Sequence, residues 1–367
     1  MTNVLFILDT LRQRFGVTSV AMNYFRNIND NVHIDFLCLP DSEDVIVNEI
    51  LDSGSKVYYM PRLTLSNFVK FRKFFIDFFS MHHEYSIVHS HFNQIDSIVF
   101  PIAKKYGQCI CVSHSHSTAF STNRIKAIRN RLMCVSINKH ADVWAACSVK
   151  AGNFLYGKGF EDSPKALVVY NGIDVMKFKF NKEVRDSVRK ELGLKNEIVI
   201  GHVGSFNIIK NHTFIIEMFS KLIKRNDYKL VLVGGGELQS EIRQKVDYLG
   251  LSDKVIFTGV RKDVNRLFQA MDIFILPSHN EGLPVVGIEA QTSGLPCLFS
   301  DTITREVGIC NSQFLSIENS SIWVDKIEEL VGFRRLDCSK IIEENGYTMT
   351  KCADKLSNFY TSIVRCK

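Results

Sequence analysis

Short apolar runs alternate with stretches of helical periodicity along the chain. The runs that predict buried strands cover residues 4–8, 33–38, 56–60, 86–90, 108–113 and 143–147 in the first half, and 198–203, 229–233, 254–258, 273–276 and 296–300 in the second. Because parallel strands are joined by helical crossovers, this alternation predicts α/β structure with parallel sheets. No internal repeat or low-complexity segment interrupts the pattern.

A break between the halves predicts two domains. The Asn171-Gly172 pair ends an apolar run and marks a turn. A chain of 367 residues is also expected to form about two domains. We therefore expect doubly wound domains over residues 1–168 and 169–346, with a cleft between them and ligands beyond the carboxyl ends of the strands. Residues 347–367 are expected to form a helix that no strand follows.

Two glutamates span a predicted strand-to-helix junction in the second half. Pro284 suits the first position of the helix, and Gly294 is expected to end it. Glu281 then precedes the helix N-terminus, and Glu289 lies about one turn inside the helix. Glutamates on a helix are more often solvated surface, so the pair by itself is a weak signal.

The start of this helix also predicts an anion site. The N–H groups of Gly282, Leu283 and Val285 are expected to point outward at the positive end of the helix dipole, where phosphate binds. The neighbouring carboxylates would repel phosphate, so we expect them to bind hydroxyl groups. A ligand that carries both a diphosphate and sugar hydroxyls is a nucleotide sugar.

Composition narrows the class of protein without identifying the ligand. A hydrophobic content of 46% with 23% charged residues is typical of a globular protein. No run approaches the roughly 18 apolar residues of a membrane span. Because the predicted strand 4–8 stands at the N-terminus, we expect no secretory signal. The ten cysteines form no C-x-x-C pair, so we expect reduced, buried thiols in a cytoplasmic protein.

Neither the net charge nor the motifs of the chain indicate a nucleic-acid partner. The net charge of +6 is mild and agrees with an anionic substrate or membrane surface without requiring either. No zinc-finger spacing, RRM signature or dense basic tract indicates nucleic acid.

Six phenylalanines in 68–79 could face lipid, but core packing is the favoured interpretation. For the basic segment 124–131, core packing and contact with anionic lipid remain equal alternatives.

Other strand ends carry candidate side chains. Lys210, which follows the strand 198–203, could reach a diphosphate, although a lone lysine is more often a surface residue. The glycines at 234–236 are better explained by tight packing than by a nucleotide fingerprint. His114 and His116 follow another strand, yet no acidic residue or third histidine nearby in the sequence supports a zinc site, so no metal is expected. His89 and His91 could line the acceptor side, but a structural, hydrogen-bonded role is the favoured interpretation for both.

Several of these motifs together resemble one family. The Glu-x7-Glu signature of retaining glycosyltransferases of family 4, which have the GT-B fold, is similar to Pro-Ser-x-x-Glu-Gly-Leu-Pro at 277–284 with Glu289. Asn-Gly-Ile-Asp at 171–174 resembles the interdomain segment of that family, and Lys210-Asn211 matches its lysine motif. Ser205 departs from the pattern, because the family carries arginine there. Arg12, Arg14 or Arg261 could substitute for that arginine.

The resemblance implies a reaction in bacterial exopolysaccharide or capsule synthesis. It implies two Rossmann-like domains and a C-terminal helix that crosses back onto the N-terminal domain. The enzyme would transfer a hexose or N-acetylhexosamine from a UDP-sugar to a lipid-linked oligosaccharide, with retention of configuration and without a metal or other cofactor. Peripheral contact with the inner face of the cell membrane would suit such an acceptor.

The resemblance also implies residue roles. Lys210 and the helix N-terminus at Gly282–Val285 would stabilise the departing diphosphate, Glu281 would position the sugar, and Glu289 would hold the ribose. Donor contacts are further implied for the residues at the matching positions, which are Gly16, Ser205, Gly259, Arg261 and His116, with His114 the alternative to His116. Two other hypotheses stay open: a UDP-sugar 2-epimerase of related fold, and a non-catalytic partner subunit, which Ser205 motivates.

Overall fold

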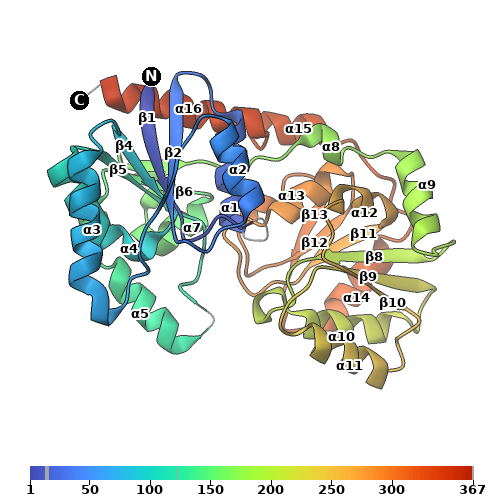
Figure 1. The fold of residues 1–367 in the computed structure, drawn as a ribbon. Coiled ribbons are helices and arrows are strands. Elements are labelled where there is room, and N and C mark those ends of the chain that lie inside the picture. Colours follow the sequence, from blue (N-terminus) through green and yellow to red (C-terminus); the bar gives the residue numbers. More distant parts are fainter. Residues whose placement is uncertain (13–15, 122, 366–367) are drawn as a thin grey trace. The chain divides into compact units, whose positions relative to one another are not determined.

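The computed structural model describes residues 1–12, 16–121 and 123–365. The chain forms two compact units (Figure 1), one of Met1–Gly172 with Met349–Lys367 and one of Ile173–Thr348. The expected domains divided the chain at residue 168, four positions before this boundary. The last helix belongs to the first unit.

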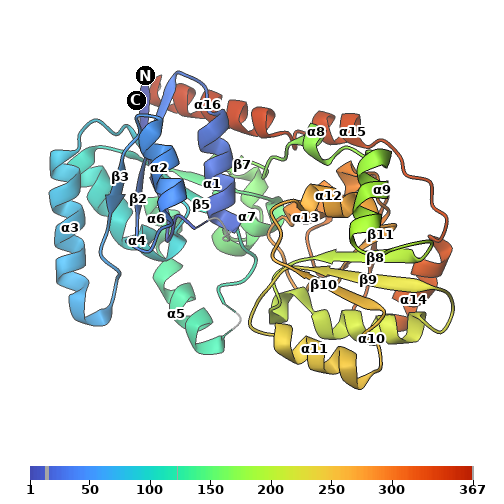
Figure 2. The same ribbon diagram turned by 45° about the vertical axis from the view of Figure 1, so that its right-hand side comes forward.

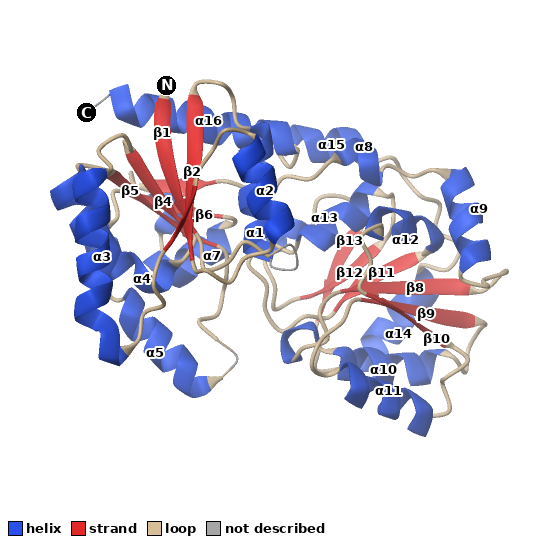
Figure 3. Ribbon diagram, viewed as in Figure 1, coloured by secondary structure: helices blue, strands red, loops and turns tan. Residues whose placement is uncertain are grey.

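The first unit contains a seven-stranded parallel sheet in the order β3-β2-β1-β4-β5-β6-β7. Figure 3 draws its strands in red with helices around them. Its strands are β1 Thr2–Ile7, β2 Val32–Cys38, β3 Val57–Tyr59, β4 Ile87–Ser90, β5 Ile110–Ser115, β6 Val143–Ala146 and β7 Ala166–Val168. The helices are α1 Gly16–Asn27, α2 Asp44–Asp52, α3 Phe68–Met81, α4 Asn93–Ile102, α5 Arg124–Cys134, α6 Ile137–His140, α7 Val149–Tyr156 and α16 Met349–Arg365. Short helical turns lie at Leu65–Asn67, Ala103–Gly107 and Phe160–Asp162.

The expected C-terminal helix is present and packs on the first unit. α16 contacts α1, β1 and β2, and it lies beside α1 in both views (Figures 1 and 2). Cys352, Leu356 and Tyr360 recur at a helical spacing and are buried in the same core as the strands. α16 therefore completes a core that residues 1–172 build.

The second unit contains a six-stranded parallel sheet in the order β10-β9-β8-β11-β12-β13. Its strands are β8 Ile198–Val203, β9 Tyr228–Val233, β10 Val255–Gly259, β11 Ile273–Leu276, β12 Cys297–Ser300 and β13 Ser312–Leu315. Its helices are α8 Val175–Phe178, α9 Lys182–Glu191, α10 His212–Leu222, α11 Gln239–Tyr248, α12 Val264–Ala270, α13 Val285–Thr292, α14 Ser320–Glu329 and α15 Ser339–Glu344. Helical turns lie at Ile208–Lys210 (η4) and Arg305–Val307.

Two strands were not predicted. β7 lies at the edge of its sheet and belongs to the apolar run before Asn171-Gly172, which was interpreted as the boundary between the domains. β13 is also an edge strand, its side chains are at least partly exposed, and its Ser-Gln-Phe-Leu sequence contains no apolar run. Edge position alone does not explain the two omissions, because β3 and β10 are also edge strands and were predicted.

The cysteines depart from the expectation of reduced thiols at one place. Cys310 and Cys338 form a disulfide in the second unit, across a separation of 28 residues. Seven other described cysteines are free and buried, as expected. The expectation was wrong for this pair because the fold of the intervening loops brings the two sulfur atoms together. A separation of 28 residues is no recognisable cysteine motif.

Four of the six phenylalanines in 68–79 are core, as the favoured interpretation held, whereas Phe68 is 42% exposed and Phe74 is half-buried. Phe71, Phe75, Phe78 and Phe79 are at most 5% exposed. Their rings contact one another along the helix and, through Phe78, reach Tyr85 before β4. This face of α3 is therefore filled by the unit itself.

Candidate active site

Three loops interlock at the carboxyl ends of β8, β9 and β10. Gly204 N–H donates to Val233 O at 2.9 Å, and Gly234 N–H donates to Gly259 O at 2.9 Å. Gly234 has a φ of 139°, and a Cβ there would lie 2.1 Å from Gly204 O. Glycine is needed for this close approach of two backbones, so the glycines at 234–236 serve packing. The interlocked loops fix where the segment after β8 runs.

That segment aims Lys210 at the loop that follows β11. The Asn207 side chain accepts from Lys210 N–H at 3.2 Å and begins the η4 turn. Asn211 ends the turn with a φ of 57°, and its Nδ2 donates to Pro277 O at 3.2 Å. His279 N–H donates to Ile209 O at 2.8 Å, which joins the two loops a second time.

Lys210 and Glu281 meet between these loops. Lys210 Nζ donates to Glu281 Oε1 at 2.5 Å, and each side chain is only 16% exposed. A Cβ at Gly204 would lie 3.0 Å from Lys210 Cδ, so the lysine stem lies directly over this glycine. The two candidates that stand 71 residues apart in the chain form one shielded ion pair.

The helix after the loop begins one residue later than expected. Pro284 is the N-cap residue, with a φ of −74° and a ψ of 97°, and the first helical residue is Val285. Its extended ψ keeps Pro284 outside the helix, so its expected place as the first helical residue was wrong. Gly294, with a φ of 74°, follows the end of the helix as predicted. A Cβ at Gly287 would lie 2.7 Å from Val307 Cγ2, so α13 packs closely against the helical turn Arg305–Val307.

The residues around the helix start are held firmly. Gly282 and Leu283 are buried, and Val285 is half-buried. Helical geometry leaves the first N–H groups of α13 without acceptors inside the helix, which favours an anion at this end. Glu289 lies one turn along and is partly buried. Burial raises the pKa of its carboxyl to about 7, and the charge of Lys177 opposes this rise.

The remaining donor-side candidates are placed less favourably. Ser205 is exposed, and Gly259 has a φ of 69° where the register between β9 and β10 shifts. Arg261 is bonded to Asp263 through Nε at 2.7 Å and to Glu191 at 3.0 Å, and these bonds raise the pKa of its guanidinium. A diphosphate would have to displace those carboxylates before Arg261 could replace the arginine expected at 205.

Two further arginines were considered for the same role. Arg12 forms an ion pair with Asp41 in the first unit. Arg14 lies outside the described residues. Gly16, in the same unit, is the exposed first residue of α1, and no atom lies within 4 Å of a Cβ built there. This glycine is therefore not required by packing.

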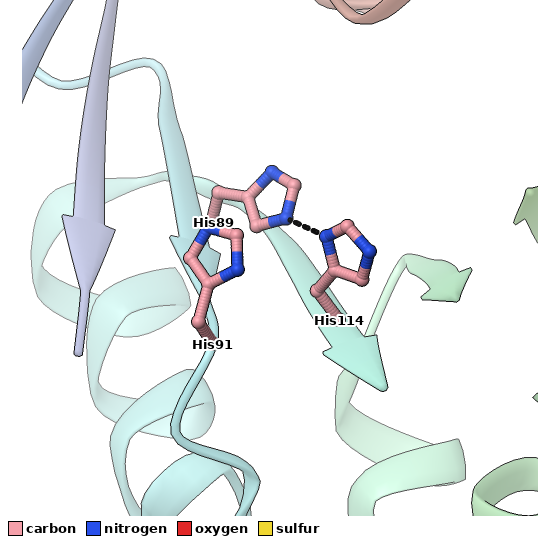
Figure 4. A group of neighbouring side chains, drawn as sticks. All are labelled: His89, His91 and His114. Atoms are coloured by element: carbon pink, nitrogen blue, oxygen red, sulfur yellow. Dashed lines mark hydrogen bonds between the residues drawn. The ribbon is translucent and has the colours of Figure 1, made fainter. Parts of the chain in front are cut away.

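Four histidines gather at the ends of β4 and β5 in the first unit. His114 is fully buried, whereas His116 is half-buried, so His116 is the more accessible of the two alternatives. His89 and His91 lie beside them, and Figure 4 shows His89, His91 and His114 as one group. The expectation that no third histidine lies nearby was therefore wrong, because β4 and β5 are neighbours in the sheet although 25 residues separate His89 from His114.

Comparison with known proteins decides the family. The family model for glycosyl transferases group 1 matches residues 184–339. EpsF of Bacillus subtilis (strain 168), whose name places it among the glycosyltransferases, is 30% identical over 97% of this chain and 96% of its own length. The chain belongs to the group 1 glycosyltransferases.

Other relatives of this glycosyltransferase extend the comparison. The Escherichia coli enzyme named UDP-Gal:alpha-D-GlcNAc-diphosphoundecaprenol alpha-1,3-galactosyltransferase is 26% identical over 95% of this chain and 94% of its own length. The crystal structure of Anabaena HepE in complex with UDP and glucose superposes with a TM-score of 0.80, at 18% identity, over 99% of this chain and all of that one. The two parallel-sheet units and the C-terminal helix agree with the expected GT-B fold.

Some supporting residues of this glycosyltransferase are not visible as motifs. Asn207 and Asn211 shape the turn that carries Lys210, and only their turn-forming residue type marks them. Tyr360 shares a hydrogen bond with His89 across 271 residues. No local pattern connects those two positions, so only the packing of α16 on the first unit reveals the contact.

Proposed function

We propose that this glycosyltransferase moves a hexose or N-acetylhexosamine from a UDP-sugar to a lipid-linked saccharide, with retention of configuration. The shielded Lys210–Glu281 pair beside the start of α13 carries this proposal. It combines a cation for the diphosphate, N–H groups for the same anion and a carboxylate for sugar hydroxyls. The Anabaena complex with UDP and glucose supports a UDP-sugar as donor.

Each residue has a defined task in this mechanism. Lys210 and the N-terminus of α13 stabilise the negative charge that develops on the leaving diphosphate, and such preorganised charge is a large part of catalysis. Glu281 orients the sugar ring through its hydroxyls. Glu289 holds the ribose, and its pKa of about 7 lets the carboxyl donate or accept a hydrogen bond there near neutral pH. The leaving phosphate itself takes the proton of the acceptor hydroxyl.

A lipid-linked acceptor at the inner face of the cell membrane fits the surface of α5. None of the described helices has the length and apolar content of a membrane span. On α5 and just beyond it, however, four large apolar side chains recur at helical spacing and are 64–80% exposed: Ile125, Ile128, Leu132 and Val135. We call them the outward stripe of α5. Exposed Arg124, Lys126, Arg129 and Arg131 flank it, as in helices that bind anionic lipid.

The acceptor class has further support from a relative. The Escherichia coli galactosyltransferase has a diphosphoundecaprenol-linked sugar in its name. The outward stripe of α5 would keep the protein at the surface where such lipids lie. The two observations are independent, since one concerns a relative's acceptor and the other concerns this chain's own exposed side chains.

The test of this function is a transfer assay with purified protein. UDP- and GDP-sugars are first screened by thermal shift, because a bound donor raises the apparent stability. The donor selected is then incubated with a lipid-linked GlcNAc acceptor, and the product's anomeric configuration is read by NMR. We expect an α-linked product from an α-linked donor, at a rate independent of added Mg²⁺ or Mn²⁺. Epimerised donor without acceptor, or donor binding without any transfer, would contradict the proposal.

Variants of the ion pair test the residue roles. Lys210→Ala should lower kcat by roughly 10²–10³-fold, the usual effect of removing one group that stabilises developing negative charge. Glu281→Ala should also abolish most transfer, and wild-type rates in this variant would refute its role. The matched control is Lys245→Ala, which breaks an ion pair of equal length, 2.5 Å to Glu217, on the outer helices of the same unit. That variant should keep the wild-type rate.

A further inference from the structure

The four histidines form a compact layer inside the first unit. His89 and His91 come from the end of β4, and His114 and His116 come from the end of β5. The ring centroids of His89 and His91 are 4.5 Å apart, and those of His91 and His114 are 5.1 Å apart. For His89, His91 and His114, one ring nitrogen from each lies within 4.8 Å of the others (Figure 4).

Three of these imidazoles are buried. His89 and His114 have no exposed surface, and His91 is 6% exposed. A neutral imidazole keeps a lone pair on one nitrogen, which is the form that binds metal ions.

Several ring nitrogens in the layer have no hydrogen-bond partner among the described residues. They include His91 Nε2 and His114 Nε2, both enclosed by protein. A buried polar atom without a partner costs free energy, so native proteins rarely leave one without a reason. The unpartnered Nε2 of His91 therefore points to a ligand beside these rings, which His114 would reach through Nδ1, the atom that now bonds His89 Nε2.

The other ring nitrogens are already oriented by neighbours. His89 Nδ1 shares a hydrogen bond with Tyr360 OH on α16, and His91 Nδ1 shares one of 2.8 Å with His116 Nε2. Both contacts occupy Nδ1, so the Nε2 atoms remain as ligands: that of His91 has no partner, and that of His89 bonds His114 Nδ1 at 3.0 Å. Metal-binding histidines have the same arrangement, since their second nitrogen is normally bonded to an outer partner that fixes the ring.

We propose that His89, His91 and His114 bind one divalent transition-metal ion of the zinc class. Three imidazoles favour Zn²⁺, Co²⁺, Ni²⁺ or Cu²⁺ over Mg²⁺ and Ca²⁺, which prefer oxygen ligands. Zinc–nitrogen bonds of about 2.0–2.1 Å need the nitrogens closer than 4.8 Å, so small ring rotations would complete the site. The ion would replace the 3.0 Å hydrogen bond between His89 Nε2 and His114 Nδ1.

The proposed ion has a structural consequence, and it would occupy His114, the alternative to His116 as an implied donor contact. It would join the end of β4 to the end of β5 and, through the His89–Tyr360 bond, stabilise the docking of α16. The residues proposed to bind the diphosphate all lie in the second unit. The metal site therefore does not depend on the proposed transfer reaction.

Cobalt binding to the full-length protein without a histidine tag tests the proposal. The protein is stripped with a chelator and titrated with Co²⁺, and visible absorption reports the coordination. We expect one ion per chain with the intense d–d bands of a tetrahedral site, displaced by one equivalent of Zn²⁺. The absence of these bands, or only the weak spectrum of an octahedral aquo-like ion, would overturn the proposal.

Variants place the ion at these histidines. Loss of an outer hydrogen-bond partner typically weakens metal affinity by roughly 10–100-fold, and we expect a loss of Co²⁺ affinity within this range for Tyr360→Phe. Loss of a ligand should cost at least as much, so we expect a loss of roughly 10-fold or more for each of His91→Gln and His114→Gln. The control is His83→Ala, an exposed histidine of the same unit that should bind as wild type. Unchanged affinity in both glutamine variants would overturn the assignment. If a glutamine variant does not fold, the spectrum of the wild type and the affinity of Tyr360→Phe decide.

Discussion

Replacing Glu289 by glutamine tests how the second carboxylate of the site is held. Burial on α13 raises the pKa of this carboxyl from 4.5 to about 7. The difference corresponds to roughly 3 kcal/mol, and we expect about 2 kcal/mol in practice because water still reaches part of the side chain. A group whose pKa is raised by folding contributes stability that is fully present below pH 4.5 and is lost as the pH rises through 7. Glu289→Gln should remove this loss.

The two tryptophans make the measurement specific to one unit. Trp323 is buried in the second unit, and Trp144 belongs to the first. In a Trp144→Phe background, urea unfolding is followed by fluorescence at pH 5 and pH 8, which gives the unfolding free energy of the second unit. The parent should lose about 1.5 kcal/mol more than Glu289→Gln over this interval, because part of the loss already lies below pH 5. Exposed Glu241→Gln on α11 is the control and should behave as the parent. Equal pH dependence in the parent and Glu289→Gln would refute the reasoning.

Two further predictions concern the interlocked loops and the outward stripe of α5. Gly234→Ala should destabilise the second unit and lower transfer, because its Cβ would lie 2.1 Å from a backbone oxygen of the β8 loop. The control is Gly250→Ala, which tests backbone strain alone because Gly250 has a φ of 66° but no atom within 4 Å of a Cβ built there. Equal loss in both glycine variants would contradict the packing role. Changing Ile125, Ile128 and Leu132 to serine should reduce flotation with anionic vesicles and leave the donor-induced thermal shift unchanged; full flotation of that variant would show that the stripe does not bind lipid.

Most of the fold was predictable because its central strands are buried on both faces. β8 and β11 occupy the predicted residues, and the other predicted strands differ from the observed ones by one or two residues at their ends. β7 was missed because its apolar run was interpreted as the boundary between the domains, and β13 was missed because its sequence contains no apolar run. The Cys310–Cys338 disulfide was missed because its partners meet through loop geometry that no spacing encodes.

The candidate site was predictable only where its residues share a local segment. Glu281 and Glu289 could be connected through the helix start between them, and the structure keeps both at α13. Sequence reasoning also selected Lys210, but its direct bond to Glu281 depends on how two loops pair at the end of a sheet. The histidine layer was missed for the same reason, because strand order brings β4 and β5 together.

The Lys210–Glu281 pair bears on the arginine that Ser205 replaces. Lys210 is the only permanently cationic residue in the segments 204–211 and 277–284, and its ammonium is already bonded to a carboxylate. In the proposed reaction, diphosphate would replace Glu281 as the partner of Lys210, and Glu281 would turn to the sugar hydroxyls. The ammonium would therefore keep an anion beside it throughout. Removing one partner of a shielded ion pair is costly because the other charge is left without compensation. Glu281→Ala therefore removes the partner of the lysine as well as the contact with the sugar. In Glu281→Gln the side-chain oxygen still accepts a hydrogen bond from the ammonium. Comparison of the two variants separates the effect on Lys210 from the effect on the sugar.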